Sequence, residues 1–155
     1  MRLSCALFVG LWMFVQPVVA QTFRVATWDL DGLETSVPDS PPSESDLNRL
    51  RQIAANLRPP NADVLLLHGL PDAQFGKRLA GYLKPATYQV VLHSSFRKTG
   101  SSSVIVGPPI TILSRKQPFA ARATEWRSTD QIDLPGGFAF AGFSAGTNAF
   151  CAYVA

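Results

Sequence analysis

The stretch "NADVLLLHGL", Asn61–Leu70, contains the clearest fold signal in the chain. Its apolar residues run without interruption through Val64–Leu67, which is typical of a strand buried on both faces. His68 and Gly69 follow at the point where this strand is expected to end. Such a strand indicates a layered α/β domain, and the polar residue at its end is a candidate functional residue.

Helix signals stand on both sides of this strand. Ser43 and Asp46 have the spacing of a capping box at the start of a helix, and Pro59-Pro60 ends that helix. The expected apolar face of this helix consists of Leu47, Leu50, Ile53 (with Ala54) and Leu57. Asp72 is the expected N-cap of a second helix. Apolar residues four positions apart are expected on its buried face, namely Phe75, Leu79 and Leu83.

Strand signals fill most of the remaining chain. The expected strands are Phe23–Trp28, Asp63–Leu67, Tyr88–His93, Val104–Val106, Thr111–Leu113, "GFAFAGF" and "NAFCAYVA". We expect 104–106 to pair with 111–113, and the last two strands to form a hairpin with Gly146 in its turn. The order β-α-β-α-β, followed by strands only, predicts an α/β or α+β layered domain.

Residues 1–20 have the pattern of a secretory signal peptide. A positive charge at Arg2 precedes an apolar run, and Val18-Val19-Ala20 supplies the small residues of a cleavage site. We therefore expect a cut after Ala20, a single domain over residues 21–155, and a secreted or periplasmic protein. The apolar run is too short for a typical spanning helix, so no transmembrane span is expected in the mature chain; an uncleaved membrane anchor is the alternative.

Charge and cysteine content restrict the function classes. The chain has 14 Lys+Arg and 11 Asp+Glu, and removal of Arg2 with the signal peptide leaves 13 against 11, a formal charge of +2. This balance allows a polyanionic partner but does not indicate one. Cys151 is the single cysteine that remains, which excludes an internal disulfide. We expect Cys151 to be a small buried residue on a strand.

The order of these segments resembles the endonuclease/exonuclease/phosphatase superfamily, the deoxyribonuclease-like metal-dependent phosphoesterases. The matching segments are "FRVATWDLDGL", "RPPNADVLLLHGL", "YQVVLHSS", "SSVIVGPPITILSR" and "GGFAFAGFSAGTNAFCAYVA". They cover nearly all of residues 22–155. The resemblance implies the N-terminal part of a four-layered α/β sandwich, with two packed mixed sheets flanked by helices. Because the strand pattern Ala149–Ala155 has no turn or polar tail after it, we expect this domain to be truncated at its C-terminus.

The resemblance also implies a chemistry, the hydrolysis of phosphodiester or phosphate-ester bonds with a divalent metal, Mg²⁺ or Mn²⁺. The implied substrates are nucleic acid, phospholipid headgroups or small phosphate esters. In the superfamily, the first strand ends in Trp-Asn-x-x-Gly and the buried strand ends in Gln-Glu. Asp29 occupies the asparagine position, His68 the glutamine position and Gly69 the position of the principal metal glutamate. The metal site implied by resemblance therefore retains Asp29 and His68 but lacks its main carboxylate.

Two interpretations of these strand ends remain open. In the first, His68 and Asp29, with Asp31 nearby, form a replacement metal site that favours zinc, manganese or iron over magnesium. In the second, His68 is a half-buried imidazole in a site that has decayed. The segment "RKTGSSS", residues 97–103, is a further candidate for phosphate contact, but it lacks the setting of a P-loop and is interpreted as a solvated loop.

The sequence thus supports two functions of different classes. One is an exported phosphoesterase. The other is a non-catalytic binding or vestigial domain of the same fold. Gly69 favours the second, and we expect no turnover from this chain alone, because a glycine provides no metal ligand.

Overall fold

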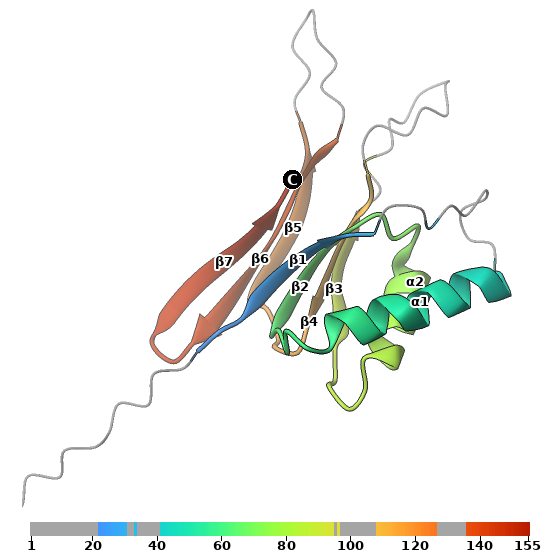
Figure 1. Cartoon of the computed structure of the whole chain (residues 1–155). Helices are drawn as coiled ribbons and strands as arrows, with labels where there is room; N and C mark the ends of the chain where they lie inside the picture. The colour runs from blue at the N-terminus through green and yellow to red at the C-terminus, as the bar shows by residue number, and fades with distance from the viewer. Residues whose placement is uncertain (1–21, 31–32, 34–40, 95, 97–107, 127–135) are drawn as a thin grey trace, which may run out of the picture.

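The structure is a computed structural model that describes residues 22–30, 33, 41–94, 96, 108–126 and 136–155. Figure 1 shows its elements in space. In chain order they are β1 (Val25–Asp29), α1 (Glu44–Leu57), β2 (Val64–His68), α2 (Ala73–Tyr82), β3 (Gln89–Ser94), β4 (Ile110–Ser114), β5 (Ala120–Glu125), β6 (Gly137–Ala145) and β7 (Asn148–Val154).

Two sheets pack against each other, and both helices lie on the outer face of the first sheet (Figure 1). The first sheet has the order β1-β2-β4-β3, and the second has the order β5-β6-β7. β1 and β2 are parallel, whereas every other neighbouring pair is antiparallel. The described residues thus form three layers: helices, a mixed sheet and an antiparallel sheet. The predicted α/β class is confirmed.

β2 lies in the middle layer, and its side chains alternate between two apolar clusters. Leu65 and Leu67 belong to the cluster on the helix side, together with Leu50, Leu57, Phe75 and Leu79. Val64 and Leu66 belong to the cluster between the sheets, together with Ile110, Ile112, Ala141 and Phe143. All of Val64–Leu67 is buried. The prediction of a strand covered on both faces is confirmed, since alternate residues of a strand point to opposite faces.

Both helices start at the caps that the sequence predicts. The Ser43 hydroxyl accepts a hydrogen bond from the Asp46 amide at 3.1 Å, and the Asp46 carboxylate accepts one from the Ser43 amide at 2.8 Å. The Asp72 carboxylate accepts hydrogen bonds from the amides of Gln74 and Phe75 at 2.7 and 2.9 Å. These side chains satisfy amides that have no partner inside the helix.

Ser43→Ala is expected to lower the free energy of unfolding by about 1 kcal/mol, because it removes the acceptor for the Asp46 amide. Urea denaturation measures this loss. Ser45→Ala is the matched control, since Ser45 is an exposed residue in the first turn of α1; its effect should stay within roughly 0.5 kcal/mol. Equal losses for the two variants would show that the capping box does not contribute to stability.

The hairpin at the C-terminal end of the described chain is also confirmed. β6 and β7 pair up to Ala145 and Asn148, and Gly146, with a φ of 62°, lies in the two-residue turn between them. Positive φ is the conformation that glycine adopts at no steric cost.

Other sequence predictions need correction. Cys151 is exposed, not buried, because β7 directs Ala152 and Val154 towards the core and Cys151 to the opposite face. β5 was not predicted, since "AARATE" has mainly exposed residues and little apolar patterning. The expected strand 104–106 lies outside the described residues. Within them, β4 pairs with β2 and β3.

Polar side chains form hydrogen bonds at the end of the first sheet where β1 and β2 begin. Arg115 Nη1 donates to the side-chain oxygen of Asn61 at 2.6 Å, and the Tyr88 hydroxyl donates to the carbonyl of Ala62. Burial raises the pKa of the Tyr88 hydroxyl.

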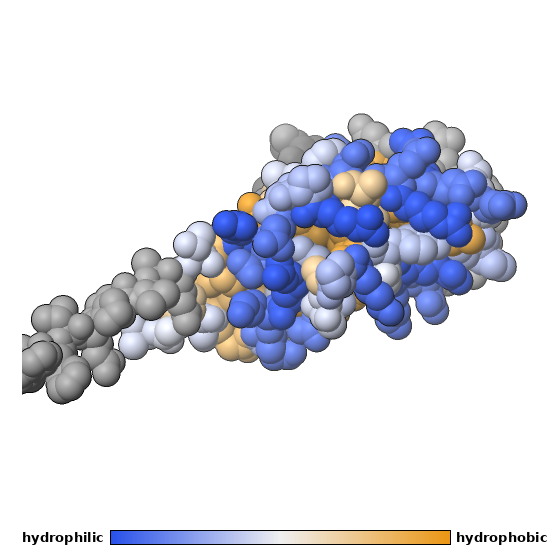
Figure 2. All heavy atoms as spheres, turned by 60° about the horizontal axis from the view of Figure 1, so that its bottom comes forward, coloured by the Kyte–Doolittle hydropathy of each residue, from blue (hydrophilic) through white to orange (hydrophobic). Residues whose placement is uncertain are grey.

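Figure 2, in which the lower side of Figure 1 comes forward, shows mainly hydrophilic residues with smaller apolar patches between them. Within the described ranges, neither helix has the length and apolarity needed to cross a membrane.

Candidate functional site

The parallel pairing of β1 and β2 makes Asp29 and His68 neighbours. They are register partners and form the last of the paired positions of the two strands. Adjacent strands lie about 4.8 Å apart, and partners in a parallel pair point to the same face. That face is the one that carries Val64 and Leu66 towards the second sheet. Asp29 is exposed and His68 is half-buried, so both can meet a solute at this end of the sheet.

The row continues across the sheet beyond His68. His68 is the register partner of Ile110 on β4, and Ile110 is the partner of Ser94 on β3. Ile110 is buried and separates the Ser94 hydroxyl from the imidazole. We call Asp29, His68, Ile110 and Ser94 the strand-end row. Its polar groups are one carboxylate, one imidazole and one hydroxyl.

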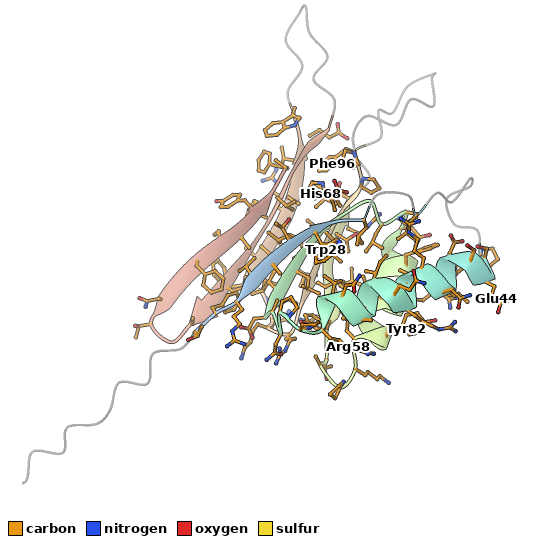
Figure 3. All side chains as sticks on the ribbon, in the orientation of Figure 1. Trp28, Glu44, Arg58, His68, Tyr82 and Phe96 are labelled. Carbon is orange, nitrogen blue, oxygen red and sulfur yellow. The ribbon has the colours of Figure 1, made fainter. Side chains whose placement is uncertain are left out.

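Phe96 closes the strand-end row on the side of the second sheet. Figure 3 shows His68 and Phe96 at the same end of the molecule. Phe96 is buried in the cluster between the sheets, to which Ile110 also belongs. Its ring lies directly against Gly137 at the start of β6, where an added Cβ would come within 2.4 Å of the ring. Ser94 and Phe96 were not predicted from the sequence, because their place beside His68 depends on the pairing of β3 with β4.

Gly69 has a backbone conformation that leaves little room for a side chain. Its φ is +86°, and a Cβ built at this position lies 3.2 Å from both the carbonyl carbon and oxygen of Leu30. The Gly69 amide donates to the carbonyl of Pro109 at 2.9 Å, and the Leu30 amide donates to the carbonyl of His68 at 3.0 Å. The backbone at Gly69 is therefore held against the end of β1. By resemblance, position 69 is that of the metal glutamate. In this chain, the backbone conformation at this position favours glycine.

The described residues bring few metal-ligating side chains close together. No group of three or more His, Cys, Asp and Glu side chains that could bind a metal gathers in the described part of the chain. Asp31, the third candidate donor, and residues 97–103 lie outside it. Asp29 and His68 offer one oxygen ligand group and one nitrogen ligand, whereas catalytic zinc sites use three protein ligands. Within the described residues, Asp29 and His68 thus offer two candidate ligand groups, and Gly69 offers no side-chain ligand.

The second histidine, His93, lies on the other face of the first sheet from His68. Its Nδ1 atom is 2.9 Å from the hydroxyl of Thr111, its register partner, which is fully buried. Thr111 is also the partner of Leu67, whose side chain faces the helices. His93 thus belongs to the face opposite to that of His68, and the two imidazoles do not share a site.

Solved structures share this architecture. An endonuclease/exonuclease/phosphatase family protein from Leptotrichia buccalis C-1013-b aligns with a TM-score of 0.61 and 8% sequence identity, over 86% of this chain and 53% of that one. A humanized D. rerio TDP2 with 14 mutations aligns with a TM-score of 0.50 and 15% identity, over 83% of this chain and 44% of that one. This chain spans about half the length of these structures. No protein-family model and no curated protein matches the sequence. The superfamily fold implied by the sequence resemblance is confirmed, whereas the second sheet of the described residues is antiparallel and not mixed as expected.

Proposed function

We propose that this chain, which has the endonuclease/exonuclease/phosphatase fold, is a member of that phosphoesterase superfamily that does not itself hydrolyse phosphate esters. The observation that carries the proposal is the backbone at Gly69. With a φ of +86° and the carbonyl of Leu30 at 3.2 Å from a built Cβ, this position disfavours any carboxylate side chain. In this proposal, the metal glutamate is absent because the residue is glycine and also because the local backbone conformation disfavours a side chain.

The remaining residues of the strand-end row support the same conclusion. Metal-assisted hydrolysis needs a cation that neutralises the phosphate and activates water. Asp29 occupies the position of a hydrogen-bond-donating asparagine, and a carboxylate accepts hydrogen bonds but repels an anionic phosphate unless a cation lies between them. Among the described residues, Asp29 does not belong to a group of three or more His, Cys, Asp and Glu side chains that could hold such a cation.

One observation favours a second candidate function. Asp29 and His68 are register partners on the same face of the sheet, so they could share a Mn²⁺ or Zn²⁺ ion if further ligands complete the site. That arrangement would make the chain a metal-dependent phosphoesterase with a rebuilt centre, acting on a nucleic acid, a phospholipid headgroup or a small phosphate ester.

Hydrolysis of bis(p-nitrophenyl) phosphate by the full chain distinguishes these candidates. With Mg²⁺, Mn²⁺ or Zn²⁺ we expect no release of p-nitrophenol above the rate with the metal alone, and no heat of Mn²⁺ binding in titration calorimetry. Metal-dependent turnover that is lost in His68→Ala and kept in His93→Ala would overturn the proposal. His93→Ala is the control because His93 faces the helix side of the sheet.

We also propose that residues 1–20 direct export and are removed after Ala20, which makes 21–155 the mature domain. The support is the sequence pattern of one early positive charge, an apolar run and small residues. Expression in a bacterial host, followed by intact mass measurement of protein from the periplasm, tests this. A mature N-terminus at Gln21 is expected. A chain that stays in the membrane fraction with residues 1–20 attached would contradict it.

A further inference from the structure

A cavity of about 490 Å³ lies between the C-terminal half of α2 and the start of β3. At Gly76, α2 packs tightly on the sheet, and an added Cβ would lie 3.2 Å from Val90 and 3.3 Å from Thr111. Gly81, further along the helix, lines the cavity, and an added Cβ there would meet no atom within 4 Å. Because Gly81 has no side chain, the space beside it stays open, and its volume is in the range of small-molecule sites.

The polar groups that line this cavity include two ammonium groups. Lys77 and Lys84 both line it, and their positions in the sequence are about two helical turns apart. Thr87 adds a hydroxyl from the segment that leads into β3. Among the described residues, no acidic side chain lines the cavity. The charge of the lining therefore favours an anion.

The other walls of the cavity are largely apolar. Ala80, Ala86 and Val90 line it together with the half-buried Tyr88. The Tyr88 hydroxyl donates its hydrogen to the carbonyl of Ala62, so Tyr88 contributes an apolar ring surface to the cavity. Ligand sites commonly combine such apolar walls with a few polar groups that fix the orientation of the ligand. The lining thus suits an anion that carries an apolar body.

The C-terminus of α2 would by itself disfavour an anion, because the helix dipole is negative at that end. Here its carbonyl groups have donors. The Leu83 amide donates to the carbonyls of Leu79 and Ala80 at 3.1 and 3.3 Å. The Arg58 guanidinium donates to the carbonyl of Tyr82 at 2.6 Å, and Figure 3 shows these two residues together. Since Arg58 brings a positive charge to the negative end of the dipole, it offsets this repulsion.

We propose that this cavity, which we call the α2–β3 cavity, binds a small organic phosphate monoester. A phosphate monoester carries a charge of about −1.5 to −2 at pH 7, which matches two ammonium groups, and lysine binds phosphate as a point charge. The Thr87 hydroxyl can donate to a phosphate oxygen. The organic part of the ligand lies against the apolar walls.

The α2–β3 cavity is separate from the strand-end row. β3 begins at Gln89, whose register partner is Ser114, and ends at Ser94, whose partner Ile110 is also the partner of His68. The cavity therefore lies at the opposite end of the first sheet from His68, on the side of the helices. Binding there does not depend on whether the strand-end row holds a metal or hydrolyses a substrate.

NMR titration of the wild-type full chain with phenyl phosphate, in buffer without divalent metal, locates the binding site. We expect the backbone amide signals of Gly81 and Thr87 to shift and those of Asp29 and His68 to stay unchanged. Inorganic phosphate should shift the same signals but bind more weakly, because it has no apolar part. Unchanged signals at Gly81 and Thr87 would overturn the proposal. So would inorganic phosphate or succinate that binds as tightly as phenyl phosphate.

Charge and shape variants test how the cavity binds this ligand. Lys77→Gln and Lys84→Gln are each expected to weaken binding of phenyl phosphate by about tenfold, because each removes a charge-assisted hydrogen bond. Arg78→Gln is the matched control, since Arg78 is exposed on α2 but does not line the cavity, and it should bind like the wild-type chain. Gly81→Leu keeps both ammonium groups but fills the cavity, and it should also weaken binding.

Two outcomes for these variants would contradict the proposal. Equal losses in Arg78→Gln and the lysine variants would show that general surface charge attracts the anion. Full binding by Gly81→Leu would show that the cavity does not hold the ligand. Lys77, Lys84 and Arg78 are exposed, so their substitution is not expected to unfold the chain. The wild-type titration does not depend on the folding of any variant.

Discussion

Phe143→Ala is expected to lower the free energy of unfolding by about 3–5 kcal/mol, because it removes a large side chain from a site that cannot collapse fully. Phe143 is fully buried on β6 between the two sheets. Its ring lies 5.6 Å from that of Phe23, before β1, and 5.6 Å from that of Phe150 on β7. The substitution therefore leaves a cavity where the two sheets and the start of the chain meet.

Phe140→Ala is the matched control for this prediction. Phe140 is on the same strand but on the outer face of the second sheet, half-buried beside Tyr153. Urea denaturation of both variants should show a clearly smaller loss for Phe140→Ala, since fewer packed neighbours surround its ring. Domains of this size are commonly stable by only about 5–15 kcal/mol, so Phe143→Ala removes a large share of the total. Similar losses for the two variants would mean that the core does not lie between the sheets.

The fold was predictable wherever local signals agree with tertiary packing. The capping pairs at Ser43 and Asp72 and the buried run Val64–Leu67 lead to the observed helices and to β2. β5 could not be found, because a strand with exposed side chains on an edge needs no apolar periodicity. Cys151 was assigned to the core for a related reason. The apolar residues of "NAFCAYVA" occupy both faces of β7, so the pattern does not reveal which face is covered.

The candidate site was predictable in part. Asp29 and His68 could be singled out as strand-end residues, but their pairing depends on the parallel register of β1 and β2, which is set by tertiary contacts. The positions of Ser94 and Phe96 near His68 depend in the same way on a tertiary contact, the pairing of β3 with β4. Gly69 could be singled out because the resemblance implies a metal glutamate at its position. Its positive φ and its contact with Leu30 come only from the path of the backbone between the strand ends.

Gly69→Glu is expected to lower the free energy of unfolding by about 1–3 kcal/mol, because a residue with a Cβ is strained at a φ of +86°. The carbonyl group of Leu30 adds to this cost, since backbone atoms at 3.2 Å from the new Cβ cannot move as a side chain can. We expect no gain in Mg²⁺ or Mn²⁺ binding and no hydrolysis of bis(p-nitrophenyl) phosphate. Titration calorimetry and urea denaturation of the same preparation measure both effects.

Two alanine variants separate the backbone cost from the effect of the carboxylate. Gly69→Ala should lose about the same 1–3 kcal/mol as Gly69→Glu, because the strain arises at the Cβ. Gly81→Ala should instead gain about 0.5–1 kcal/mol, since Gly81 lies within α2 and an added Cβ there meets no atom within 4 Å. If Gly69→Glu keeps the stability of the wild-type chain and binds Mg²⁺, the backbone is not the obstacle. The strand-end row would then lack only one side chain, and Asp29 and His68 would be the remains of a metal centre that a single substitution restores.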